Sequence, residues 1–112
     1  MSQVTTHILD TTKGKPAAGV TITLFAKEGQ SWQKIAKGIT NDDGRIPDLL
    51  KTDALLPLGI YKMNFEVHSY FAAQQTESFY PTVDIIFEIK TTEHYHVPLL
   101  LNPFGYSTYR GS

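Results

Sequence analysis

Alternation of apolar and polar residues with a period of two is the feature that most restricts how this chain can fold. Three segments show it clearly, namely GVTITLFA (19–26), GIYKMNFEVH (59–68) and VDIIFEIK (83–90). Successive side chains of a β-strand point to opposite faces of a sheet, so a strand that buries one face alternates in this way. The residues expected to face a core are Val20, Ile22, Leu24, Tyr61, Met63, Phe65, Val67, Val83, Ile85, Phe87 and Ile89.

Turn residues separate the strands. The segments TKGKPAAG (12–19) and NDDG (41–44) combine glycine with proline, asparagine or aspartate, and each predicts a turn. Only HSYFAAQQTES (68–78) indicates a helix, about two turns long. Seven or eight short strands at this spacing predict an all-β fold, an antiparallel two-sheet sandwich with one short helix, formed by a single domain over residues 1–112.

The C-terminal third predicts a hairpin. HYHVPLLL (94–101) and FGYSTYR (104–110) are two strand candidates separated by Asn102 and Pro103. Pro98 lies inside the first of them and has no N–H to donate. That strand is therefore expected to bend at Pro98 or to leave the hydrogen-bonded ladder locally.

Composition excludes several classes of function. The 112 residues carry ten basic and eleven acidic side chains, a formal charge of −1. Because no basic run provides a positive surface, no nucleic-acid partner is expected. No segment approaches the ~20 apolar residues of a membrane span, and the first ten residues lack the pattern of a secretory signal. No membrane partner is expected, and a cytoplasmic location is.

Histidines are the first candidates for chemistry. His94 and His96 form an H-x-H pair, and this spacing places both on one face of a strand. His7 falls in the middle of another strand, on the face of Thr5 and Leu9. Paired imidazoles suit a metal, and three histidines could form a zinc site with an open position for water. His68 alone is more simply a surface residue.

Arginine offers a second interpretation of the same site. Arg45 follows the turn at 41–44, and an arginine beside neutral imidazoles would repel a cation. Its forked donors would instead suit a planar, oxygen-rich ligand, which favours an anionic or carbonyl-rich substrate over a metal. An ordinary exposed arginine after a turn remains the alternative. With no cysteine in the chain, thiolate nucleophiles and thiolate metal ligands are excluded.

Several stretches resemble one enzyme family. THILDTTKGKPAAGV (6–20) and HYHVPLLLNPFGYSTYRGS (94–112), with TNDDGR (40–45) between them, closely resemble the transthyretin-like 5-hydroxyisourate hydrolases of the transthyretin (prealbumin) family. The final YRGS (109–112), placed after HVPLLL, is the most specific part of the match. The resemblance extends over essentially the whole chain.

The resemblance implies a fold, an activity and an assembly. The family has the prealbumin sandwich, two four-stranded sheets with one short helix. Its members hydrolyse 5-hydroxyisourate, the product of urate oxidation, to 2-oxo-4-hydroxy-4-carboxy-5-ureidoimidazoline. They need no metal and no organic cofactor, and they form homotetramers with active sites in the channel where two dimers meet.

The resemblance also implies the site residues. The catalytic residues it implies are His7, His96, Arg45 and Ser112, and the substrate-binding residues are Arg45, Tyr109, Arg110 and Gly111, with no metal ligand. His94 is expected to line the edge of the channel without a catalytic role. Hormone-carrying transthyretins share the fold but replace both histidines and the arginine and lack the terminal tetrapeptide. A small-ligand binding protein of that type, without catalysis, is therefore the alternative to the enzyme.

Overall fold

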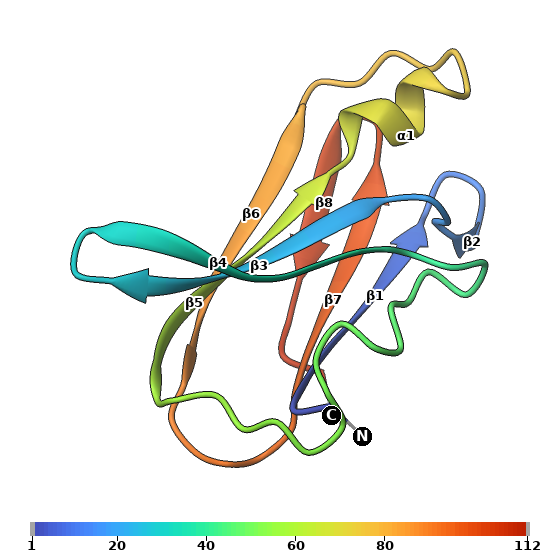
Figure 1. The fold of residues 1–112 in the computed structure, drawn as a ribbon. Coiled ribbons are helices and arrows are strands. Elements are labelled where there is room, and N and C mark those ends of the chain that lie inside the picture. The colour runs from blue at the N-terminus through green and yellow to red at the C-terminus, as the bar shows by residue number, and fades with distance from the viewer. Residues whose placement is uncertain (1, 112) are drawn as a thin grey trace.

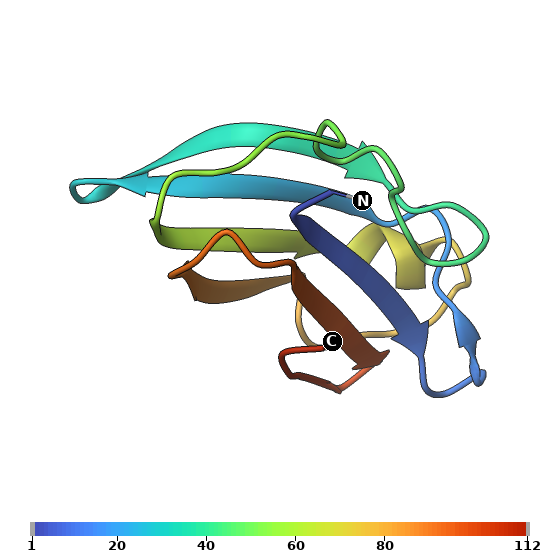
Figure 2. The ribbon, with the colours of Figure 1, turned by 90° about the horizontal axis from the view of Figure 1, so that it is seen from below.

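Two four-stranded sheets form most of the computed structural model, which describes residues 2–111 (Figure 1). Their strand orders are β2-β1-β7-β8 and β4-β3-β5-β6, and Figure 2 shows them as two layers. The predicted two-sheet sandwich is confirmed, with eight strands and one helix in the described residues. The elements are β1 (Val4–Asp10), β2 (Lys15–Pro16), β3 (Thr21–Glu28), β4 (Ser31–Ile39), β5 (Gly59–Glu66), α1 (His68–Ala72), β6 (Thr82–Ile89), β7 (Tyr95–Asn102) and β8 (Gly105–Thr108).

The core lies between the sheets and consists of the residues that the alternation assigned to it. Ile22 and Leu24 on β3 meet Met63 and Phe65 on β5, and all four are fully buried. Each such side chain stabilises the fold by about 1.5–3 kcal/mol through removal of apolar surface from water. Phe87 is the member of the predicted set that stays half-buried, where it packs against the edge of the core.

One strand pair is parallel, unlike every other pair of neighbouring strands in the described residues. Strands β1 and β7 run in the same direction, and their register pairs Thr5 with His96 and His7 with Pro98. Residues paired in register on adjacent strands point to the same face of the sheet. Because the core takes Val4, Thr6 and Ile8 of β1, the residues between them lie on the outer face.

Pro98 interrupts the hydrogen-bonded ladder only on the side of β7 that faces β8. β7 runs unbroken from Tyr95 to Asn102, and Pro98 keeps its place beside β1. On the other side, β8 ends at Thr108, whose hydroxyl donates to the Pro98 carbonyl at 2.7 Å. Three residues after Thr108, Gly111 pairs with His96 in the same antiparallel register. The predicted local departure from the ladder is confirmed, and it lies on the β8 side.

The helix is shorter than predicted. It spans His68–Ala72, whereas the sequence indicated 68–78. Gln75 has a φ of 56° in the left-handed region, which an α-helix cannot include. The N–H groups of Gln75 and Thr76 donate back to the carbonyls of Ala72 and Phe71, the hydrogen-bond pattern of a helix C-terminus. This helix, the one found in residues 2–111, is far too short to cross a membrane.

Two strands lie where the alternation predicted none. β2 has two residues and pairs with Leu9 and Asp10 inside the predicted turn at 12–19. β4 is a long strand at the edge of its sheet, and most of its residues are exposed. A strand with neither face well buried does not show a clear period of two, so its pattern is weak.

Candidate active site

The two histidines of the H-x-H pair share a face, as their spacing predicted. The rings of His94 and His96 are stacked, with centroids 6.3 Å apart and an angle of 24° between their planes. His96 lies on the outer face of β7, because its neighbours Tyr95 and Val97 point into the core. His7 lies on the same outer face of the neighbouring strand β1, and all three imidazoles are half-buried.

Thr5 connects the two stacked rings. Its hydroxyl oxygen lies 2.8 Å from Nε2 of His94 and 2.8 Å from Nδ1 of His96. This contact depends on the parallel register, which puts Thr5 beside His96. The analysis of the sequence placed Thr5 on the face of His7 but gave it no role. Its position two residues before His7 was the one signal available, and a threonine on a strand is too common to stand out.

A tight turn holds Arg45 at the edge of this group. The Asn41 side chain accepts hydrogen bonds from the backbone N–H groups of Asp43 and Arg45 at 2.9 and 3.1 Å. Gly44 joins the turn to β1, since its carbonyl accepts from the N–H of Ile8 at 3.0 Å. Gly44 has a φ of +72°, and a Cβ there would lie 2.5 Å from the Ile8 carbonyl oxygen. Only glycine fits this approach, so Gly44 fixes the position of Arg45.

The electrostatics keep the imidazoles neutral. Burial, followed by the positive charge of Arg45, lowers the pKa of His7 below its ordinary value of 6.5, against a smaller opposing effect of Asp43. Burial also lowers the pKa of His96, and the charges of Arg45, His94 and His7 add to this effect. Both side chains are therefore uncharged at neutral pH. A neutral imidazole can accept a proton from a bound water.

The segment that follows β8 from residue 109, here called the tail, contacts His96 through Gly111. The Gly111 N–H donates to the His96 carbonyl at 2.9 Å. A Cβ at this position would lie 2.5 Å from Cδ2 of the His96 ring, closer than real side chains approach one another. Glycine therefore lets the tail pack directly on the imidazole. Ser112, the other predicted residue of the tail, lies outside the described residues.

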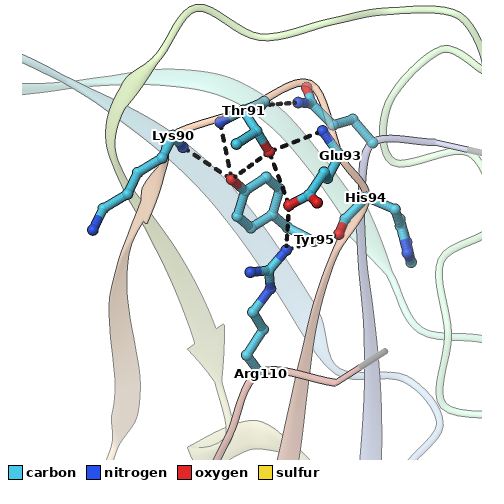
Figure 3. Close-up of polar contacts among 7 residues, drawn as sticks. Lys90, Thr91, Glu93, His94, Tyr95 and Arg110 are labelled. Atoms are coloured by element: carbon cyan, nitrogen blue, oxygen red, sulfur yellow. Dashed lines mark hydrogen bonds and ion pairs between the residues drawn. The ribbon is translucent and has the colours of Figure 1, made fainter.

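Arg110 is anchored on the other side of the tail (Figure 3). Its guanidinium lies 3.4 Å from the Glu93 carboxylate, 3.4 Å from the His94 carbonyl and 4.4 Å from the centre of the Tyr95 ring. Tyr95 is fixed in turn, because its hydroxyl accepts from the N–H groups of Lys90 and Thr91. The His94 imidazole points away from these contacts (Figure 3). Arg110 thus holds the tail against β7.

A cavity of about 530 Å³ lies beside the tail residues. It opens between the edges of the two sheets, with walls from β6, β7 and the end of β8. His96, Tyr109 and Arg110 line it, whereas His7 and Arg45 do not. We place the candidate site on the outer face of β1 and β7, because His7, His96 and the charge of Arg45 meet there. His96 borders both this face and the cavity.

The donor set suits an oxygen-rich ligand. Within residues 2–111, no group of three or more His, Cys, Asp and Glu side chains is arranged to hold a metal ion. The positive charge of Arg45 also disfavours a cation beside the imidazoles. Neutral bases near the exposed guanidinium of Arg45 can bind a carbonyl or an anion and take a proton from water. His68 lies apart from this group, exposed on α1.

Comparison with known proteins identifies the family of this chain. The profile of the HIUase/Transthyretin family matches residues 4–111. A curated relative, the 5-hydroxyisourate hydrolase of Mus musculus, is 46% identical over 114 residues, covering 99% of this chain and 96% of the relative. Among solved structures, Klebsiella pneumoniae 5-hydroxyisourate hydrolase has a TM-score of 0.85 at 42% identity, covering 100% of this chain and 94% of the other.

The backbone alone does not separate enzymes from carriers in this group. Sea bream transthyretin in complex with thyroxine has a TM-score of 0.91 at 30% identity, covering 97% of this chain and 94% of the other. Its fold is at least as similar as that of the Klebsiella hydrolase, although its sequence is less so. The distinction therefore depends on side chains. On the profile match and the identity to its relatives, the chain belongs to the HIUase/Transthyretin family.

Proposed function

We propose that this protein hydrolyses 5-hydroxyisourate to 2-oxo-4-hydroxy-4-carboxy-5-ureidoimidazoline, in the degradation of urate. The observation that carries the proposal is the group formed by His7, His96 and Arg45, two neutral imidazoles beside a guanidinium. The 46% identity to a protein named 5-hydroxyisourate hydrolase supports it. These are also the three residues that, by the resemblance, hormone-carrying transthyretins replace.

Ring opening needs water to attack a carbonyl carbon, negative charge to develop on its oxygen, and a ring nitrogen to leave with a proton. His7 and His96 orient the water, and one of them takes its proton and then, as imidazolium, gives a proton to the leaving ring nitrogen. Arg45 binds substrate oxygens and stabilises the developing charge. Ser112 positions the water or an imidazole through its hydroxyl. Nothing in this sequence of steps requires electron transfer, and the protein acts without a cofactor.

The tail completes the proposed pocket. Gly111 packs on the His96 ring, and Tyr109 follows the last residue of β8 with most of its surface exposed. Tyr109, Arg110 and Gly111 contact the substrate in this proposal, with Arg110 also fixing the path of the tail through Glu93 and Tyr95. The cytoplasmic location stays a prediction from the sequence.

We also propose that the protein forms a homotetramer. Large apolar side chains are exposed on the site-bearing hairpin and on β6, where Phe104 and Ile86 are 62% and 60% accessible in the single chain. Edge strands β8 and β6 also present unpaired backbone groups. Sedimentation equilibrium is expected to give four times the mass of one chain. A mass of one or two chains at micromolar concentration would contradict the assembly.

The activity is tested with urate and urate oxidase, by following the decay of the 5-hydroxyisourate absorbance. The wild-type protein should accelerate this decay, and His96→Asn should reduce kcat by about 100-fold or more, the usual contribution of a general base. His68→Asn, at an exposed histidine outside the site, is the matched control. A wild-type rate equal to spontaneous decay would refute the enzyme. Loss of activity in chelator, restored by zinc, would refute a cofactor-free reaction.

Arg45 is expected to lower the pKa of both histidines further than burial alone does. A nearby positive charge disfavours the imidazolium, so Arg45→Gln should raise the pKa of His7 and His96 toward 6.5. NMR titration of histidine-labelled protein measures both values directly. Arg110→Gln is the control, because Arg110 contacts Glu93 and Tyr95 and should leave both values unchanged. Unchanged values in Arg45→Gln would separate Arg45 from the site.

Gly111→Ala should reduce activity without unfolding the protein. The new methyl group would lie 2.5 Å from the His96 ring, so either the tail or the imidazole must move. We expect at least a tenfold loss of kcat/KM, about 1.4 kcal/mol of transition-state stabilisation, and an unchanged urea midpoint. Gly105→Ala is the control on the same hairpin, since its Cβ would make ordinary contacts with Asn102.

Deletion of residues 109–112 should also abolish most activity, and full turnover in that variant would exclude the tail from the site.

A further inference from the structure

The hydroxyl of Thr5 lies between two imidazole nitrogens and has a single proton. Its oxygen is 2.8 Å from both Nε2 of His94 and Nδ1 of His96, so each distance is that of a hydrogen bond. The hydroxyl can donate to only one of the two nitrogens, and the other nitrogen must donate to it. The three groups therefore form a directed chain, and its direction decides which nitrogen of His96 carries the proton.

Only one direction leaves His96 able to act as a base. If Nδ1 of His96 donates to Thr5 and Thr5 donates to Nε2 of His94, then Nε2 of a neutral His96 keeps a free lone pair. In the opposite direction, Nε2 of His96 carries the proton and can act only as a donor. Within residues 2–111, Nε2 of His96 has no hydrogen-bond partner, so it is the nitrogen that remains available to a water or substrate.

We propose that Thr5 and His94 are positioning residues that hold His96 as the Nδ1–H tautomer, which makes Nε2 of His96 the base of the reaction. This inference rests on the proposed function, and it assigns the role that the site geometry left open between His7 and His96. Neither Thr5 nor His94 needs to touch the substrate. When Nε2 takes a proton from water, the Nδ1–H of the resulting imidazolium still donates to the Thr5 hydroxyl.

The fold makes little other use of the Thr5 side chain. The neighbouring hydroxyl of Thr6 donates to the Val97 carbonyl at 2.7 Å and so ties β1 to β7. Among the described residues, the Thr5 hydroxyl bonds only to ring nitrogens, on the outer face of the sheet. The ring of His94 stacks on His96 and is half-buried. His7 and Arg45 are the other ionisable groups that act on His96, and neither is the partner of its Nδ1.

The test combines tautomer measurement with kinetics. Spectra of ¹⁵N-histidine-labelled protein at pH 8 should show His96 protonated at Nδ1 and bare at Nε2. Thr5→Val keeps the branched shape but removes the hydroxyl. It should shift His96 toward the Nε2–H tautomer and lower kcat by about 10- to 100-fold, the range seen when a group that orients a functional histidine is lost. KM should change little.

Matched variants separate hydrogen bonding from packing. Thr5→Ser retains the hydroxyl and should keep both the tautomer and most of the activity. His94→Gln can still accept a hydrogen bond near the position of Nε2 and should do the same, whereas His94→Leu should behave like Thr5→Val. Urea midpoints should be similar for all four, which keeps a folding defect from imitating the effect.

The outcomes distinguish this inference from the proposed function. A wild-type protein that fails to accelerate the decay of 5-hydroxyisourate refutes the function, and the tautomer spectra are still interpretable without activity. An active wild-type protein with His96 protonated at Nε2, or with full kcat in Thr5→Val, overturns the inference alone.

Discussion

The parallel pairing of β1 with β7 is the contact on which the site depends. It joins residues about ninety positions apart in the chain, and its register sets Thr5 beside His96. A shift of one residue would turn His96 or Thr5 into the core and expose an apolar neighbour. The same ladder that buries Ile8 and Leu99 therefore aligns the imidazoles outside. Pairing two strands so far apart in the chain costs more loop-closure entropy than forming a hairpin between neighbouring strands.

A second constraint is electrostatic. Arg45 lies close enough to both His7 and His96 to lower their pKa values, and partial burial acts in the same direction. The turn that carries Arg45 is joined to β1 through Gly44, where no larger residue fits. The backbone of Arg45 is thus fixed beside the imidazoles, while its side chain is exposed. The result is a positively charged site whose histidines are bases, which suits an electron-rich substrate.

Much of this arrangement could be predicted from the sequence, and the failures have physical reasons. Alternation correctly assigned the core residues of β3 and β5, and the H-x-H spacing placed His94 and His96 on one face. Alternation says nothing about which strand lies beside which, so the parallel pair and the contact of Thr5 with both rings were not foreseen. β4 escaped notice because charged residues such as Lys34 and Lys37 occupy an exposed edge strand. The helix was predicted too long because its end depends on the left-handed conformation of Gln75, for which glycine is the usual signal.

Pro98 has a consequence for how the tail is attached to the site. Because it offers no N–H toward β8, the ladder stops at Thr108 and resumes with a single bridge at Gly111. The residues between them, Tyr109 and Arg110, lie outside the ladder, and Arg110 is held instead by Glu93, the His94 carbonyl and the Tyr95 ring. The free energy that holds Gly111 on the imidazole is therefore largely separate from the free energy that holds β8 in its sheet. The tail is thus fixed to β7 by side-chain contacts and one bridge, while the ladders of the sandwich beneath it form independently of these contacts.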